Sequence, residues 1–152
     1  MFPSQPAPND SLLLDQHVVR SFAFSRATFG PGARSEGIIQ HIEKEITELR
    51  EAINKEDSND VEVAMEWADL LILSLDGLTR HLAYNVATHD DKTEMVDPRI
   101  LAVDVVRLLN YKQARNESRE WPNWRDFDQD CPIEHIRTDS DDEPNDEPND
   151  EV

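Results

Sequence analysis

Four acidic residues fall into two short motifs, and the spacing within each motif puts a pair of carboxylates on one face of a helix. Glu45 and Glu48 are three residues apart, and Glu66 and Asp69 repeat that spacing farther along the chain. Residues three apart are neighbours on a helix surface. Carboxylate oxygens supplied by two adjacent helices suit a hard divalent cation. The two motifs therefore predict a metal centre.

The second motif lies in an apolar stretch that offers little solvated surface. Residues 63–78 read VAMEWADLLILSLDGL, and Glu66, Asp69 and Asp76 project to one side of a helix built from them. An ionised carboxylate that is buried alone is costly, so buried acids are paired, protonated or bound to a metal. Because cationic residues are scarce in this helix before Arg80, we expect a bound cation to neutralise the acids.

The first motif taken alone has a plainer interpretation, as a solvated helix flank whose acids pair with Lys44 and Arg50. The type of metal follows from the other possible ligands. The chain has one cysteine, Cys131, and its histidines lack the spacing of metal ligands. They are His17, His41, His81, His89 and His135. Oxygen ligands without such a Cys/His set favour Mg²⁺ or Mn²⁺ over Zn²⁺.

A third group of residues indicates a phosphate-bearing substrate. Magnesium held by carboxylates usually shares its remaining positions with waters and substrate phosphates. Lys112, Asn116 and Arg119, at spacings of four and three, present cationic and amide donors on one face of a later helix. The alternative is a basic helix flank in an acidic protein.

Helical periodicity supplies the elements that would position these groups. Alternating strand patterns are absent, so we expect an all-α bundle. The first helix would run from a cap at Asp10 or Ser11 to the FGPG break. The second would be capped by Ser35 and would end between Lys55 and Ser58. Its inward face would carry Ile38, Ile42, Ile46, Leu49 and Ile53.

The third and fourth helices follow the same logic. The third would begin at Asp57 or Ser58, end near Ala83, and pack antiparallel to the second because the link is short. The fourth would begin at Asp97-Pro98 and end near Glu120. Its inward positions would be Ile100, Val103, Val105, Val106 and Leu109.

The domain organisation follows from composition. We expect a disordered N-terminus over residues 1–9, one domain over residues 10–137 and a disordered acidic tail over residues 138–152, where the EPND repeat lies. The formal charge is −18, and the chain is acidic outside the tail as well. Such a charge disfavours binding to nucleic acid or to anionic membranes. Without a signal or spanning segment, we expect a cytoplasmic protein.

Taken together, these residues resemble the metal signature of the MazG-like nucleotide pyrophosphohydrolases, in which E-x-x-E precedes E-x-x-D on two helices. FSRATFGPGARSEGIIQHIEKEITEL, EWADLLILSLDGLTR, KQARNESREWP and PIEHIR resemble the dATP/dGTP diphosphohydrolase branch of phages and bacteria, over about residues 22–137. The resemblance implies a four-helix-bundle-like MazG-type fold, a homodimer or homotetramer, and cleavage of a purine deoxynucleoside triphosphate into its monophosphate and pyrophosphate.

The resemblance also implies roles for single residues. The metal ligands, binding two or more Mg²⁺ or Mn²⁺ ions, would be Glu45, Glu48, Glu66 and Asp69, with Glu48 the candidate proton acceptor. The substrate-binding residues would be Lys112, Asn116, Arg119 and Trp121. Asp76 would orient a neighbour or touch a metal. Lys44 stands where the family often carries a further acid, so a fifth ligand from that position is not counted.

Other functions stay open at this point. The metal motif does not select the base, so a pyrimidine triphosphate such as dUTP or dCTP is an alternative substrate. A narrower purine function, in phages that replace adenine with 2-aminoadenine, is implied by the branch. An acidic DNA-mimic protein is the alternative from another class, although acids in an apolar helix would not serve mimicry. A purely structural bundle would leave the buried acids uncompensated.

Overall fold

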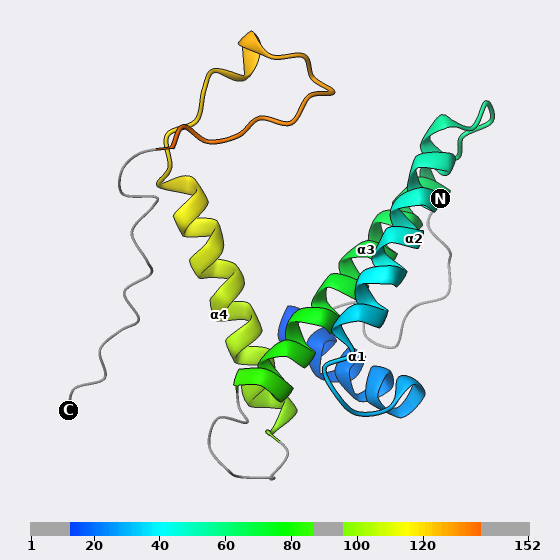
Figure 1. Cartoon of the computed structure of the whole chain (residues 1–152), viewed down its shortest axis with the longest axis vertical. Coiled ribbons are helices and arrows are strands. Elements are labelled where there is room, and N and C mark those ends of the chain that lie inside the picture. Colours follow the sequence, from blue (N-terminus) through cyan, green and yellow to red (C-terminus); the bar gives the residue numbers. More distant parts are fainter. Residues whose placement is uncertain (1–12, 87–95, 138–152) are drawn as a thin grey trace. The chain divides into compact units, whose positions relative to one another are not determined.

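The computed structural model describes residues 13–86 and 96–137, and these residues are helical without strands. The prediction of an all-α fold is therefore confirmed (Figure 1). The described elements are α1 (Leu14–Phe29), α2 (Ser35–Asn54), α3 (Asp60–His81), the π-helical turn η1 (Leu82–Val86), α4 (Pro98–Glu117) and the short 3₁₀ helix η3 (Trp124–Asp126). The predicted disordered segments, residues 1–9 and 138–152, lie outside the described residues.

The chain divides into two compact units, one up to Leu108 and one from Leu109 onward. The first unit contains α1, α2, α3, η1 and the beginning of α4. The second contains the end of α4 and the segment around η3. None of the helices in residues 13–86 and 96–137 combines the length and apolar character needed to span a membrane.

Helices α2 and α3 form an antiparallel hairpin, as the short link predicted (Figure 1). The start of α3 differs from the expected cap at Asp57 or Ser58. Asn59 is the N-cap, and its side chain accepts a hydrogen bond from the backbone N–H of Val61. Ser58 instead donates its hydroxyl to the carbonyl of Ala52, 3.0 Å away, and thereby helps to close the end of α2.

The buried face of α2 is rotated from the predicted isoleucine stripe. Ile38 and Leu49 are buried as expected, but Ile46 and Ile53 are exposed. Glu45 is only 7% exposed and lies on the buried face. The prediction failed because apolar residues occupy two flanks of α2, so that periodicity alone does not show which flank meets α3. Ser35 is the first helical residue rather than the cap, since Arg34 precedes it with a left-handed backbone, φ 50°.

The core of the first unit joins α1, α3 and the beginning of α4. Val18, Leu75, Ala102 and Val105 form one buried cluster. In α4 the expected face was only partly right, because Val105 is buried as predicted but Ile100, Val103 and Leu109 are exposed. Leu101 and Ala102 are buried instead. Helix α1 begins at Leu14 without a side-chain cap, and the predicted caps Asp10 and Ser11 lie outside the described residues.

A buried arginine on α3, Arg80, holds the turn between α1 and α2 in place through hydrogen bonds. The guanidinium of Arg80 donates to the carbonyl oxygens of Gly30, at 3.1 Å and 3.2 Å, and of Gly32, at 2.6 Å. Both glycines have positive φ, which favours residues without a Cβ. The same guanidinium bonds to Ser25 and Asp76. This network sets how α2 leaves the turn and hence where its acidic residues face.

Candidate metal centre

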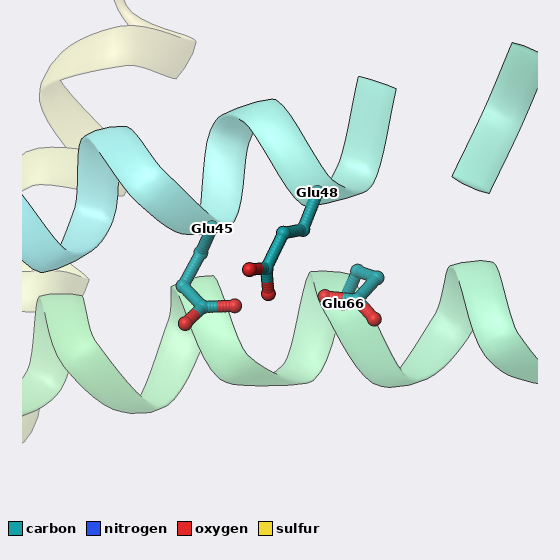
Figure 2. Close-up of side chains that lie close together, drawn as sticks. All are labelled: Glu45, Glu48 and Glu66. Atoms are coloured by element: carbon teal, nitrogen blue, oxygen red, sulfur yellow. The ribbon is translucent and has the colours of Figure 1, made fainter. Parts of the chain in front are cut away.

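Three carboxylates from the two hairpin helices converge. Glu45 and Glu48 project from α2 toward α3, and Glu66 faces them from α3 (Figure 2). One potential ligand atom from each residue lies within 4.8 Å of the other two. Three of the four predicted metal ligands are therefore brought together by the fold.

Glu45 is the most enclosed member of this carboxylate cluster. Its Oε1 atom lies 3.0 Å from Nε2 of His41, one turn earlier on α2. The same oxygen accepts a hydrogen bond from the ammonium of Lys44, at 3.4 Å. Two neighbours on the same helix thus hold this carboxylate in place through one of its oxygens.

Lys44 also forms an ion pair with Glu48, one turn farther along α2. The hydrogen bond from Lys44 holds the pKa of the Glu48 carboxyl below its usual value, and the same bond raises the pKa of Lys44. The predicted pairing of the first motif with Lys44 is thereby present. It coexists with the cluster instead of replacing it.

Glu66 is in the opposite electrostatic situation. Desolvation raises its pKa above the ordinary value, and the charges of Glu48, Asp69 and Glu45 raise it further. Within the described residues Glu66 has no ion pair with a cation. The ammonium of Lys44 therefore contacts Glu45 and Glu48, whereas no cation in the described residues pairs with Glu66.

The remaining predicted acids lie elsewhere on α3. Asp69 is exposed and is not among the three converging carboxylates, although its charge reaches Glu66. Asp76 accepts hydrogen bonds from Ser25, at 2.8 Å, and from Arg80, at 3.1 Å. We expected that ion pairs within the helix would not neutralise Glu66, Asp69 and Asp76. For Asp76 this expectation is wrong, because Arg80 on the same helix pairs with it.

The surroundings of α3 also differ from the sequence interpretation. Met65, Trp67 and Leu71 are at least half exposed in this chain, so the helix is apolar without being covered on all sides. Helices α1 and α2 pack against only part of its circumference. The argument from burial therefore applies to Asp76 and in part to Glu66, whose pKa is raised by desolvation, but not to the exposed Asp69.

A cleft of about 580 Å³ opens beside the carboxylates. It lies along the hairpin between α2 and α3, and its lining residues are Glu48, Glu51, Ala52, Asn54, Lys55, Glu62 and Glu66. Two members of the cluster, Glu48 and Glu66, thus face a space within the size range of small-molecule sites. The cleft is strongly acidic, with Lys55 its one cationic lining residue.

The carboxylates fit a hard divalent cation. In octahedral Mg²⁺ coordination, oxygens bound at about 2.1 Å lie between about 2.9 and 4.2 Å apart. The cluster oxygens, within 4.8 Å of one another, need only small side-chain rotations to reach that range. All three donors are carboxylate oxygens, the type that Mg²⁺ and Mn²⁺ prefer.

The predicted phosphate-binding residues lie in the second unit and are arranged around the end of α4. Arg119 donates to the side-chain oxygen of Asn116 at 3.2 Å, and the indole N–H of Trp121 donates to the backbone carbonyl of Asn116 at 2.8 Å. The Trp121 ring also packs edge-on against His135, with centroids 5.9 Å apart. Lys112 is exposed.

Sequence reasoning missed two neighbours of the cluster. His41 was set aside because no second histidine has ligand spacing, yet it bonds to Glu45. Lys44 was considered only as a surface partner. The signal for both was present in the i, i+4 spacings His41 to Glu45 and Lys44 to Glu48, which place these side chains together on one helix.

An all-α protein with carboxylates converging from two adjacent helices belongs, by fold and site, with proteins able to hold divalent cations. A comparison with protein families narrows this class to one family. Residues 18–142 match the family described as dATP/dGTP pyrophosphohydrolase, so most of the chain is covered and the chain belongs to this family. A search of curated proteins found no match, and neither did a search of solved structures.

Proposed function

We propose that this protein is a metal-dependent pyrophosphohydrolase that cleaves dATP or dGTP between the α and β phosphates, releasing the deoxynucleoside monophosphate and pyrophosphate. The family implies the activity. The observation that supports the metal dependence is the convergence of Glu45, Glu48 and Glu66 from α2 and α3. Asp69 is proposed as a fourth ligand, because its charge already reaches Glu66.

The acidic cleft explains why a cation is needed. A triphosphate carries several negative charges, and the cleft is lined by Glu48, Glu51, Glu62 and Glu66. When bound, Mg²⁺ or Mn²⁺ ions would offset this repulsion, polarise the phosphoryl group and lower the pKa of an attacking water. We propose two or more ions per site with substrate present.

The carboxylates of the chain have distinct positions in this reaction. Glu45 is anchored by His41 and Lys44 and does not line the cleft, so its role is to hold the metal. Glu48 and Glu66 line the cleft, and a water entering there meets one of these two first. The proton acceptor is drawn from this pair, and we assign the role to Glu48.

The substrate contacts outside the metal centre are proposed on the chemistry of the second unit. Lys112 and Arg119 would bind phosphate oxygens, and Asn116 would donate from its amide group. Trp121 would contact the base. The narrower form of the proposal is removal of dATP and supply of dGMP in a phage that replaces adenine with 2-aminoadenine. A cytoplasmic location suits a nucleotide substrate and the free, exposed Cys131.

We also propose that the chain forms a homodimer or homotetramer. Ile39, Ile46 and Ile53 recur every seven residues on α2, and all three are exposed. Met65, Trp67 and Leu71 add exposed apolar surface on the first half of α3. A large apolar surface left open by a single chain is typical of an interface with a second copy.

The decisive experiment is hydrolysis of each dNTP and NTP by the purified full chain with Mg²⁺, with Mn²⁺ and with a chelator. We expect metal-dependent conversion of dATP or dGTP to the monophosphate and pyrophosphate. Preferential hydrolysis of dUTP or dCTP would replace the purine assignment. Release of inorganic phosphate without pyrophosphate would overturn the cleavage position, and full activity in chelator would overturn the metal dependence.

A further inference from the structure

Lys44 occupies an unusual place for a lysine beside a candidate metal centre. It directly precedes Glu45 on α2, and its ammonium contacts Oε1 of Glu45 at 3.4 Å and Oε1 of Glu48. It therefore touches two of the three converging carboxylates at once. A carboxylate has two oxygens and several lone pairs, so Glu45 and Glu48 can each accept a contact from Lys44 and still bind a metal ion.

We propose that the ammonium of Lys44 is a built-in cation of the metal centre that takes the place of one divalent ion, so that the nucleotide-free protein binds a single divalent ion. This inference rests on the proposed function and concerns the same site. Further ions enter only together with the triphosphate, which brings its own negative charge.

The charges at the cluster support this count. Glu45, Glu48 and Glu66 carry three formal negative charges, and Lys44 supplies one positive charge directly against two of them. One divalent ion then balances the remaining charge of these three carboxylates, and Asp69, which is exposed and outside the converging set, is left out of the count. Without the ammonium, an excess negative charge remains, and a second divalent ion has both the charge and the free carboxylate oxygens to bind.

The position of the single ion follows from the same contacts. Glu48 forms an ion pair with Lys44, whereas Glu66 lies within the same cluster and has no ion pair to a cation in the described residues. An ion held between the carboxylates of Glu48 and Glu66 would supply Glu66 with the cation that it lacks.

A lysine at the rim of the same cleft provides a matched control. Lys55 pairs with Glu62 at 3.2 Å and lines the cleft, but it contacts none of the three converging carboxylates in the described structure. If any nearby positive charge limits metal binding, both lysines should matter. If direct contact with the cluster is required, only Lys44 should.

The test counts Mn²⁺ ions bound to the nucleotide-free full chain, by electron paramagnetic resonance of unbound Mn²⁺ and by calorimetry. We expect one ion per chain for the unchanged protein, for Lys55→Gln and for Lys44→Arg, which keeps the charge. We expect two for Lys44→Gln, with the first bound roughly tenfold more tightly because a competing cation is gone. Thermal melts in chelator verify that each variant is folded.

The outcomes separate this inference from the proposed function. Equal stoichiometry and affinity for Lys44→Gln and the unchanged protein would overturn the role of Lys44 while leaving the metal centre intact. Two ions on the unchanged protein would do the same, because the ammonium would then be displaced by metal. A chain that binds no Mn²⁺, or a Glu66→Gln variant that binds it as the unchanged chain does, would overturn the centre itself.

Discussion

Asp76 and Arg80 form a buried ion pair one helical turn apart on α3, with Nε of Arg80 lying 3.1 Å from both carboxylate oxygens. The Arg80 side chain has no exposed surface and also holds the carbonyls of Gly30 and Gly32. Asp76 therefore compensates a buried cation. Its role is to fix the α1 to α2 turn, in contrast to the carboxylates that face the cleft.

Asp76→Asn should destabilise the protein, because the change removes the charge that compensates Arg80. Breaking a buried ion pair on one side costs about 3–5 kcal/mol in free energy of unfolding. Urea unfolding followed by circular dichroism measures this loss. Asp104→Asn is the control, because its pairing with Arg107 is exposed and contributes less than about 1 kcal/mol. A small loss for Asp76→Asn would contradict the structural role.

Glu66→Gln should remove activity and metal-induced stabilisation together. The variant loses a proposed ligand that faces the cleft, and we expect kcat/KM to fall roughly 100-fold or more. Added Mn²⁺ at about 100 times its dissociation constant should stabilise the unchanged protein by about 2.7 kcal/mol and the variant much less. Kinetics and thermal melts with and without Mn²⁺ measure both effects.

The control for this prediction is Glu43→Gln, an exposed acid on α2 that is not part of the converging cluster. It removes the same charge from the same helix pair and should leave both activity and the Mn²⁺ response close to those of the unchanged chain. Equal losses in the two variants would indicate a general effect of net charge and not a ligand role for Glu66.

The stability of the metal-free protein should depend on pH, and part of this dependence should come from Glu66. Its pKa in the folded protein is raised above the ordinary value of 4.5, first by desolvation and then by the charges of Glu48, Asp69 and Glu45. Between these two values the folded state binds more protons than the unfolded state, so this group makes stability fall as pH rises through the raised pKa. Its favourable contribution is fully present only below the unfolded pKa.

The measurement is the melting temperature of the unchanged protein and of Glu66→Gln, both in chelator, from about pH 4 to about pH 8. This range includes the pKa values of carboxyl groups in proteins. The variant should gain stability relative to the unchanged chain as pH rises, since its amide never ionises. Glu48 should contribute in the opposite direction, because its lowered pKa makes its stabilisation disappear as pH falls. A pH-independent difference would refute the role of Glu66.

The helices could be predicted from the sequence because they follow from apolar periodicity. The hairpin of α2 and α3 could be predicted because the link between them is short. The sequence did not determine the buried faces. Glu45 lies inward while Ile46 and Ile53 lie outward, because α2 is apolar on two flanks and only the packing partner selects one. The spacing of the two motifs predicted that Glu45, Glu48, Glu66 and Asp69 lie together, and the first three of them do converge.

The partner of Asp76 shows a different limit. Arg80 was visible in the sequence, but its bonds to Ser25 and to the carbonyl of Gly30 join residues at least 50 positions apart. Such long-range contacts have no local pattern. The same holds for Asp69, whose exposure depends on how much of α3 is covered and not on the apolar residues beside it.

Lys112→Gln should weaken substrate binding without affecting the metal centre. A charge-assisted hydrogen bond to phosphate contributes about 1.5–3 kcal/mol, so its loss should lower kcat/KM roughly ten- to hundredfold. Mn²⁺ affinity and melting temperature in the absence of nucleotide should stay unchanged, because Lys112 is exposed and lies in the second unit. Gln113→Ala, at the next position on α4, is the control, and unchanged kinetics of Lys112→Gln would remove Lys112 from the site.

Ile46→Lys should convert the proposed oligomer into a monomer. Ile46 is the middle member of the exposed series Ile39, Ile46 and Ile53, so a charge there would have to be buried if a second copy covers this surface. Light scattering coupled to size-exclusion chromatography measures the mass, and circular dichroism verifies the helices. Gln40→Lys adds the same charge to an exposed position beside Ile39, on a different face of α2, and should leave the mass unchanged. A folded Ile46→Lys variant with the mass of the unchanged oligomer would show that the isoleucine face is not the interface.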